Sequence, residues 1–356
     1  MPFVHASDRD RDFFVPDKEL RHFCRVLSNL SQEQPSHAEV VKALANDMIL
    51  PFLAVSWQPL SVVAAGGHHT CVVTRNKELV CFGHNDFGQC EVPPNLGPVI
   101  SVAAGSEHTC VLKASGQVVC FGNNEFGQCD VPSTLGPVVA VAAGGMHTCA
   151  LQSNGALVCF GQSSLGQCDV PNDLGPVVSI AAGGAHTCAV TATGQLVAFG
   201  DNAFGQLNVP PNLGQVTAVA AGSHHTCAPR LLSGTFFLQE SIAVTASAGL
   251  VSFGGNILGQ CDSPPDLGPV VAVAARLLYT CAVRATGELV CFGCIDFEDM
   301  HQPPDLGPIV AVAAGTCHVC AVKKSGEVVC FGHNDCGQCT APFEGLVADC
   351  DRFAKG

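Results

Sequence analysis

A histidine and a cysteine recur two residues apart in this chain, and such a pair could form a thiolate–imidazole dyad for nucleophilic chemistry. His69 and Cys71 are one such pair, and on a strand their side chains would share a face. The pair returns at His108 and Cys110, His147 and Cys149, His186 and Cys188, His225 and Cys227, and His318 and Cys320. An active site is one asymmetric group of residues, whereas a pair repeated along the chain is typical of a scaffold. We therefore predict no catalytic residue and no enzyme activity, and we expect each histidine to hydrogen-bond turn backbone inside its own unit.

Other cysteines are placed where they could form disulfides. Cys71 and Cys81 lie symmetrically about a predicted hairpin turn, as do four further pairs: Cys110 and Cys120, Cys149 and Cys159, Cys281 and Cys291, and Cys320 and Cys330. A bridge in each hairpin would be possible if the Cβ atoms face each other. Ala198 and Ser252 replace the second cysteine in two units, which suits packing of a small residue. We favour reduced thiols in a core, with bridged pairs as the alternative.

A metal site is a further possibility near the C-terminus. Cys317, Cys320, Cys336 and Cys339 have the spacing of a zinc ribbon. Two of them are ordinary repeat positions, however, and strands would hold the four sulfurs at opposite ends. The glycine pairs, such as Gly66-Gly67, precede strands and not helices, so they do not form a phosphate-binding loop. We expect no metal and no cofactor.

The His-Thr-Cys triplet belongs to a longer tandem repeat. It starts at His69, His108, His147, His186 and His225, each 39 residues after the last, with degenerate copies at Tyr279 and His318. A Phe-Gly pair follows each triplet, at Phe82, Phe121, Phe160, Phe199, Phe253, Phe292 and Phe331. The one irregular step, from His225 to Tyr279, is 54 residues, 15 more than the period, and it defines an insertion at residues 228–242. Seven units of constant period indicate a repeat architecture.

Each unit reads as three short strands. In the third unit these are Val138–Ala143, His147–Gln152 and Leu157–Gly161, separated by glycine-containing turns. Small antiparallel sheets of this kind bury their faces only against their neighbours, and radial closure removes exposed edges. We predict an all-β fold, a seven-bladed β-propeller of 39-residue repeats. The small-residue first strand should lie nearest the axis, and the Phe of Phe-Gly should pack between blades.

The repeat carries a family resemblance in the phrase Val-Ala-Ala-Gly-x-x-His-Thr-Cys-x-Val, followed by Gly-x-x-Val-Cys-Phe-Gly-x-Asn-x-x-Gly-Gln. It resembles the repeat of the regulator of chromosome condensation family, whose members form seven-bladed propellers. The short period is similar to its three-stranded branch, typified by the type-II beta-lactamase inhibitor protein. Seven copies cover about four-fifths of the chain. One departure is Phe where many relatives carry Trp.

This resemblance implies protein binding through one face of the propeller. Family members include exchange factors for a small GTPase, segments of HECT ubiquitin ligases, protein inhibitors and a plant photoreceptor. The photoreceptor needs a cluster of tryptophans, and this chain has only Trp57. We expect a non-catalytic protein–protein interaction scaffold. The first alternative is an exchange factor or regulator of a small GTPase, and the second is a propeller adaptor of a ubiquitin ligase.

Composition and charge limit the partners. The formal net charge is −14, and no Lys or Arg occurs between Lys113 and Arg230. A protein that binds nucleic acid neutralises several phosphates with clustered cations, so neither nucleic acid nor an anionic membrane is expected as a partner. A basic protein surface suits this charge better. The first residues carry charges where a signal peptide would be apolar, so we expect a cytoplasmic or nuclear location, and a monomer.

Segments outside the regular repeat are candidates for specific function. We assign residues 1–15 to a disordered tail, 16–55 to a small helical segment, 56–342 to the propeller and 343–356 to a C-terminal tail. In the insertion, Arg230, Phe236, Phe237 and Leu238 are candidate interaction residues, unless the segment is an artefact of the gene model. The sixth unit is degraded at Arg276 and Tyr279, which are also candidate interaction residues, although drift in a tolerant blade explains the change equally simply.

Overall fold

The structure is a computed structural model that describes residues 61–229, 249–294, 302–343 and 345–349. The chain divides into two compact units. Residues 1–52 and 235–240 form one unit, which lies outside the described residues, and residues 53–234 and 241–356 form the other. The predicted tail 1–15, the helical segment 16–55 and most of the insertion therefore lie outside the described part. None of the described residues forms a helix that is long and apolar enough to cross a membrane.

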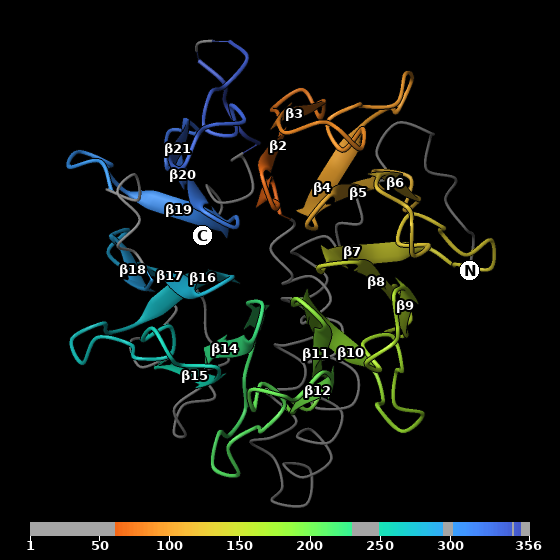
Figure 1. The fold of residues 1–356 in the computed structure, drawn as a ribbon, viewed down its shortest axis with the longest axis vertical. Coiled ribbons are helices and arrows are strands. Elements are labelled where there is room, and N and C mark those ends of the chain that lie inside the picture. The colour runs from red at the N-terminus through yellow and green to blue at the C-terminus, as the bar shows by residue number, and fades with distance from the viewer. Residues whose placement is uncertain (1–60, 230–248, 295–301, 344, 350–356) are drawn as a thin grey trace, which may run out of the picture. The chain divides into compact units, whose positions relative to one another are not determined.

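The described residues form seven three-stranded antiparallel sheets, which we call blades 1 to 7 in chain order (Figure 1). The strands are β1 (Val63–Ala65), β2 (His69–Val73) and β3 (Leu79–Gly83); β4 (Val99–Ala104), β5 (His108–Lys113) and β6 (Val118–Gly122); β7 (Val138–Ala143), β8 (His147–Gln152) and β9 (Leu157–Gly161); β10 (Val177–Ala182), β11 (His186–Thr191) and β12 (Leu196–Gly200); β13 (Ala220–Ala221), β14 (His225–Pro229) and β15 (Leu250–Gly254); β16 (Val270–Arg276), β17 (Tyr279–Arg284) and β18 (Leu289–Gly293); and β19 (Ile309–Ala314), β20 (His318–Lys323) and β21 (Val328–Gly332).

The three strands predicted for the third unit are confirmed at both ends of each strand. Their hairpin turn places Gly155 at φ +82°, a conformation that side chains with a Cβ avoid. The register pairs Cys149 with Cys159 and His147 with Gly161. The other blades repeat this register, so equivalent residues of the seven units occupy equivalent places.

The blades close into a ring, as predicted. The first strand of each blade contacts the first strand of the next: β1 with β4, β4 with β7, β7 with β10, β10 with β13, β13 with β16, β16 with β19, and β19 with β1. This arrangement confirms that the Val-Ala-Val-Ala-Ala strand is the innermost one. Its small side chains suit the place where seven strands converge.

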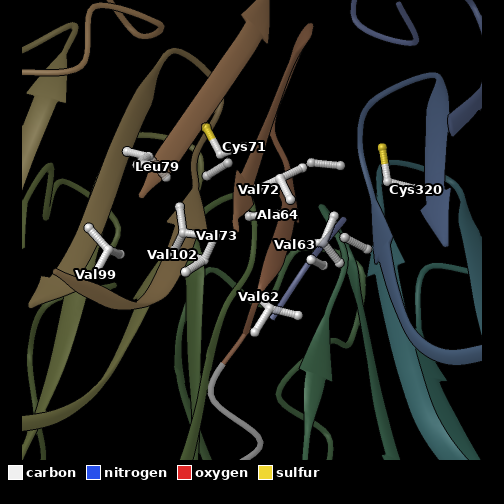
Figure 2. Close-up of a cluster of buried hydrophobic side chains, with 14 of the residues drawn as sticks. Val62, Val63, Ala64, Cys71, Val72, Val73, Leu79, Val99, Val102 and Cys320 are labelled. Carbon is white, nitrogen blue, oxygen red and sulfur yellow. The ribbon is translucent and has the colours of Figure 1, made fainter. Parts of the chain in front are cut away.

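Apolar packing joins each blade to the one before it. Figure 2 shows a cluster in which Cys320 of blade 7 and Val99 of blade 2 flank Val72 of blade 1. Phe82 of blade 1 is buried in the same cluster. Likewise, Phe199 of blade 4 is buried beside residues of blade 3, which include Cys149 and Leu151. The predicted position of the Phe-Gly aromatic ring between blades is confirmed.

The ring is sealed by the segment that follows the last repeat. Val347 forms an isolated bridge with Glu327 of blade 7, and Ala348 forms one with Thr74 of blade 1. Asp349 makes an ion pair with Lys77 of blade 1. Residues 345–349 thus connect the last blade to the first and are part of the propeller.

Candidate functional site

The recurring histidines join neighbouring blades. In five blades the His Nε2 lies 2.9–3.1 Å from the hydroxyl of the threonine in the next blade: His69 and Thr109, His108 and Thr148, His147 and Thr187, His186 and Thr226, and His225 and Thr280. His318 makes the same contact with Thr70 at 2.9 Å and so closes the ring. The prediction that each histidine bonds turn backbone inside its own unit was therefore wrong. The strand carries the imidazole to the blade edge, where the nearest polar group belongs to the neighbour.

The hydrogen bonds of the threonine determine which ring nitrogen of the histidine carries the proton. Thr109 Oγ1 donates its one proton to the carbonyl of Gln89, 2.8 Å away. It must then accept the proton of His69 Nε2, which leaves His69 Nδ1 unprotonated and without a described hydrogen-bond partner. Nε2 of His69 is thus occupied by its hydrogen bond to Thr109, and Nδ1 is buried. His69 and Cys71 are both fully buried. We call this His–Thr–carbonyl contact between blades the latch.

The hairpin cysteines face each other directly, and two pairs are bonded. The register places Cys71 opposite Cys81, Cys110 opposite Cys120 and Cys149 opposite Cys159. Disulfides join Cys281 to Cys291 and Cys320 to Cys330, so the preference for reduced thiols was wrong at these two pairs. Bridging is possible because directly opposed residues of an antiparallel pair bring their Cβ atoms within reach.

Two of the sulfurs outside the hairpin pairs, those of Cys188 and Cys90, pack as neutral thiols. Cys188 faces Ala198, and burial raises the pKa of its thiol to about 12. Burial likewise raises the pKa of Cys90 in the loop after β3 to about 12. The zinc-ribbon spacing is used differently: Cys320 is bonded to Cys330, and Cys339 Sγ lies 3.5 Å from the carbonyl of His333. Within the described ranges, no three His, Cys, Asp or Glu side chains are placed to hold a metal ion.

Blades 6 and 7 meet through a different latch. Tyr279 takes the histidine position, and its hydroxyl lies 2.8 Å from the carbonyl of Gly315 and 2.7 Å from that of His318. Val319 takes the threonine position and is buried in the same apolar cluster as Tyr279. The two substitutions therefore match each other across the interface. Tyr279, predicted as an interaction residue, is only 1% exposed and presents no surface to a partner.

Arg276, the other predicted residue in this unit, is also buried. It stands where six blades have glycine, and there a Cβ would lie 2.2–2.3 Å from the ring of the latch histidine. Tyr279 in place of histidine removes this conflict in blade 6. The junction of blades 6 and 7 thus carries three substitutions that fit one another: Arg276 and Tyr279 in the sixth unit and Val319 in the seventh.

An exposed apolar band lies on one face of the propeller. We call this end of the blades the loop face: it carries the turn after each first strand and the loop after each third strand. Phe87, Phe126, Leu165, Phe204 and Leu258 occupy the same loop position in blades 1 to 5 and are 40–54% exposed. Ile257 and Met146 add exposed apolar surface on the same face. Large apolar side chains exposed at the same loop position of five successive blades make this face a candidate interaction surface.

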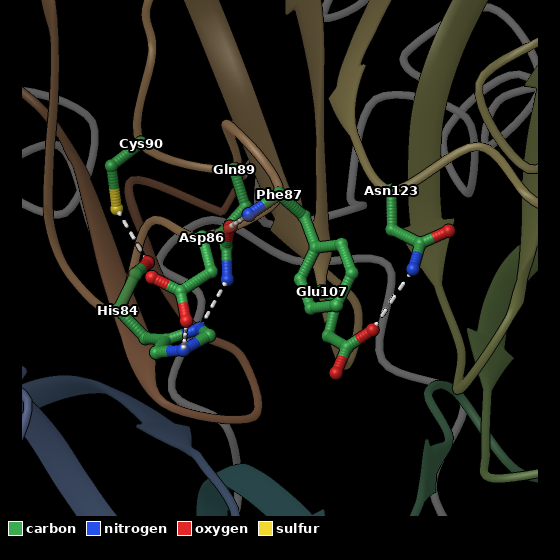
Figure 3. A network of polar contacts seen from close by, with 7 residues as sticks. All are labelled: His84, Asp86, Phe87, Gln89, Cys90, Glu107 and Asn123. Carbon is green, nitrogen blue, oxygen red and sulfur yellow. Dashed lines mark hydrogen bonds and ion pairs between the residues drawn. The ribbon is translucent and has the colours of Figure 1, made fainter.

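Buried glutamines hold these loops in place. Gln89 is 1% exposed, accepts the N–H of Phe87 at 3.1 Å and donates to His84 Nδ1 at 2.9 Å (Figure 3). Because His84 Nδ1 accepts, its Nε2 carries the proton and donates to Asp86 at 3.1 Å. Gln128, Gln167, Gln206, Gln260 and Gln338 make the same contact with the loop backbone in their blades. This role was not predicted from the sequence, although the repeated Gly-Gln pair was its signal.

The exposed described cations lie at one end of the blades, whereas described carboxylates occur at both ends. The described carboxylates of the loop face are Asp86, Glu91, Glu107, Glu125, Asp130, Asp169, Asp201, Asp262 and Asp335. The described cations other than Arg276 lie near the hairpin between the second and third strands of their blades, at the end opposite the loop face: Arg75, Lys77, Lys113, Arg284, Lys323 and Lys324. Arg276 is buried. The loop face is therefore acidic and apolar. The predicted interaction residues Arg230, Phe236, Phe237 and Leu238 lie outside the described residues.

Comparisons with known proteins agree with this geometry. The model of the regulator of chromosome condensation (RCC1) repeat matches residues 61–89, 99–128, 138–167, 177–206 and 309–338. No curated protein matches the chain. The unmatched units are the fifth, which carries the insertion, and the sixth, which carries Arg276 and Tyr279.

Solved structures with the same fold share little sequence. The CRINKLY WD40 ectodomain of the Arabidopsis thaliana receptor kinase ACR4 aligns with a TM-score of 0.62 and 22% identity, over 77% of this chain and 97% of that chain. Yeast RCC1 (Prp20), bound to Kap60, aligns with a TM-score of 0.62 and 18% identity, over 83% and 85%. Human WBSCR16 aligns with a TM-score of 0.59 and 20% identity, over 74% and 86%. With five of its seven units matched and the propeller formed, the chain belongs to the RCC1 repeat family.

Proposed function

We propose that this protein is a non-catalytic scaffold that binds a protein partner on its loop face. The observation that supports the proposal is the band of exposed Phe87, Phe126 and Phe204, each held by a buried glutamine. Apolar groups kept at the surface by a dedicated network lose little conformational entropy when they are covered. Aromatic anchors supply most of the binding energy at such interfaces.

The charge of the loop face selects the kind of partner. Asp86, Glu125 and Asp201 lie in the same loops as the aromatic anchors, and the described part of this face has no exposed Lys or Arg. A basic segment with apolar residues between its charges would satisfy both features. Opposite charges speed encounter and set orientation, and salt weakens this contribution.

The test compares two surfaces of matched exposure. The full chain is used as bait with the substitutions Phe87→Ser, Phe126→Ser and Phe204→Ser combined, and Val271→Ser serves as the control. Val271 and Phe87 are both 46% exposed, but Val271 lies near the hairpin end of β16. We expect the triple variant to recover at least tenfold less of the partner than the wild type, since one anchor contributes about 1–2 kcal/mol of binding free energy. Equal recovery of the same partner by the triple variant would exclude the loop face as the binding surface.

Regulation of a small GTPase is the alternative with a defined assay. An exchange factor accelerates nucleotide release, and the inserted residues 228–242 are the candidate wedge. The assay measures release from purified small GTPases with the intact protein and with Phe236→Ala and Phe237→Ala combined. Exchange activity is supported if the intact protein accelerates nucleotide release and the double variant does not. If the intact protein does not accelerate release, the exchange-factor alternative is excluded. A recovered ubiquitin ligase would instead support the adaptor alternative.

A further inference from the structure

Arg276 has an unusual environment for a buried arginine. It ends β16, and its Nη2 lies 3.3 Å from Ser106 Oγ, a residue of blade 2 on the other side of the ring axis. Ser106 Oγ is its one hydrogen-bond partner among the described residues, and no described carboxylate forms an ion pair with it. The guanidinium therefore lies at the loop-face end of the axis, and the described residues supply one acceptor, Ser106 Oγ, for its five N–H groups.

Burial of a cation without a counter-charge is unfavourable. Burial lowers the pKa of Arg276 from its usual value, and among the described residues Tyr279, not a carboxylate, opposes this effect. Of the described loop-face carboxylates, Glu107 follows Ser106 in the chain and accepts a hydrogen bond from Asn123 Nδ2 at 3.0 Å, and the others are in the loops after the third strands. Such an arrangement is expected where the counter-charge comes from a ligand and not from the protein.

The groups around Arg276 are donors of the right kind for an anion. Ser106 belongs to the turn after a first strand, and the equivalent positions hold Ser223 in blade 5 and Thr316 in blade 7, which flank blade 6. Neither hydroxyl is engaged in a described hydrogen bond. The equivalent positions in blades 1, 3 and 4 are glycines packed against the backbone of the next turn, and they offer no side-chain donor.

We propose that Arg276 and Ser106 form a binding site for one small oxyanion, a phosphate or a carboxylate, at the loop-face end of the propeller axis. The guanidinium would bind two oxygens of the anion side by side, and the hydroxyls of Ser106, Ser223 and Thr316 would donate to the others. This site is independent of the aromatic anchors of the loop face.

The test titrates the full chain with sodium phosphate, and separately with sodium acetate, at constant ionic strength balanced with sodium chloride. Tm is followed as a function of anion concentration, and the dissociation constant for inorganic phosphate is measured by calorimetry. A ligand that binds only the folded state raises Tm with the logarithm of its concentration. The variants are Arg276→Met, Ser106→Ala and, as a matched control, Arg284→Met, whose guanidinium lies at the hairpin end beside Asp266 and Glu288.

We expect Tm to rise with one of the two anions in the wild type and in Arg284→Met, and not in Arg276→Met. The stronger response identifies the preferred oxyanion. Ser106→Ala, which keeps the arginine, should bind the anion several-fold more weakly, and it decides the question if Arg276→Met does not fold. The proposal is overturned if the wild type responds equally to phosphate, acetate and chloride, or if Arg276→Met or Ser106→Ala retains full affinity.

Discussion

The junction between blades 6 and 7 differs from the junction between blades 4 and 5, although both join the same kind of sheet. His186 reaches Thr226 across one junction, whereas Tyr279 faces Val319 across the other and bonds backbone carbonyls instead. The junction of blades 4 and 5 contains a titratable imidazole and a side-chain hydroxyl as its partner. The junction of blades 6 and 7 has no imidazole at this position and an apolar valine in place of the threonine. At this junction the histidine position and its partner in the next blade differ from the repeat together, which avoids burying an unmatched polar group.

Acid sensitivity is the largest difference expected between the two kinds of latch. Burial lowers the pKa of His186 to about 3, of His225 to about 4 and of His318 to about 3, from 6.5. The unfolded chain therefore binds more protons than the folded one between about pH 6.5 and these values. The stability is fully present above pH 6.5 and is lost as the pH falls. Each histidine contributes a slope of up to about 1.4 kcal/mol per pH unit in this window.

Urea unfolding measured between pH 7 and pH 4 tests this prediction. The paired substitution His186→Tyr with Thr226→Val copies the sixth latch into the fourth junction and removes one buried imidazole. We expect its free energy of unfolding to fall less steeply with acidification than that of the wild type. A slope equal to that of the wild type would show that these histidines do not determine the acid response.

The second prediction reverses the exchange. Tyr279→His alone should destabilise the protein by about 2–4 kcal/mol, since it removes two hydrogen bonds, opens a cavity and places an imidazole N–H against Val319. The new ring would also meet the Cβ of Arg276, as a Cβ would in the other blades.

Adding Val319→Thr and Arg276→Gly to Tyr279→His should recover most of this loss, as measured by urea unfolding. Tyr279→Phe is the control, because it keeps the ring and removes only the hydroxyl. If Tyr279→His is as stable with Val319 and Arg276 unchanged as it is in the triple variant, the three positions are not coupled.

A smaller effect is expected at a regular junction. Thr187→Val should cost about 1–3 kcal/mol, because it leaves the buried Nε2–H of His147 and the carbonyl of Gln167 without their described partner. Thr134→Val is the control, since Thr134 is exposed and lies in the linker between blades. The difference in denaturation midpoint between the two variants measures one latch. Equal midpoints would mean that water replaces the threonine at no cost.

The fold was predictable from the sequence because its information is periodic. The constant period predicted the seven units, and short apolar runs between glycine-containing turns predicted strands such as β7 to β9. The small inner strand and the Phe between blades followed from the geometry of convergence. By contrast, the histidine partner lies 40 residues away in the next unit, and nothing within one repeat shows it. The contact could have been found only by comparing neighbouring units: the sixth unit has Tyr279 in place of the histidine, and the seventh has Val319 in place of the threonine.

The loop face was less predictable for a different reason. An apolar residue in a loop, such as Phe87 or Phe126, reads as core until the loop is placed, since sequence does not show which side of a turn faces solvent. The residues singled out for breaking the repeat divided in the same way. Arg276 and Tyr279 proved to be inside the ring, and the insertion residues lie outside the described part of the chain.

The smallest expected effect concerns the backbone of the unusual blade. Leu277 has φ +39°, a left-handed conformation that a residue with a Cβ adopts at a cost of about 1–2 kcal/mol. Glycine removes this cost but has a more flexible unfolded chain, so Leu277→Gly should be more stable than Leu277→Ala by about 0.5–1 kcal/mol. Leu277→Ala is the control, because it removes the same half-buried side chain and keeps the Cβ. If the alanine variant is as stable as the glycine variant in thermal unfolding, the turn of blade 6 is not strained. The side chain of Arg276 would then reach the axis without a backbone cost.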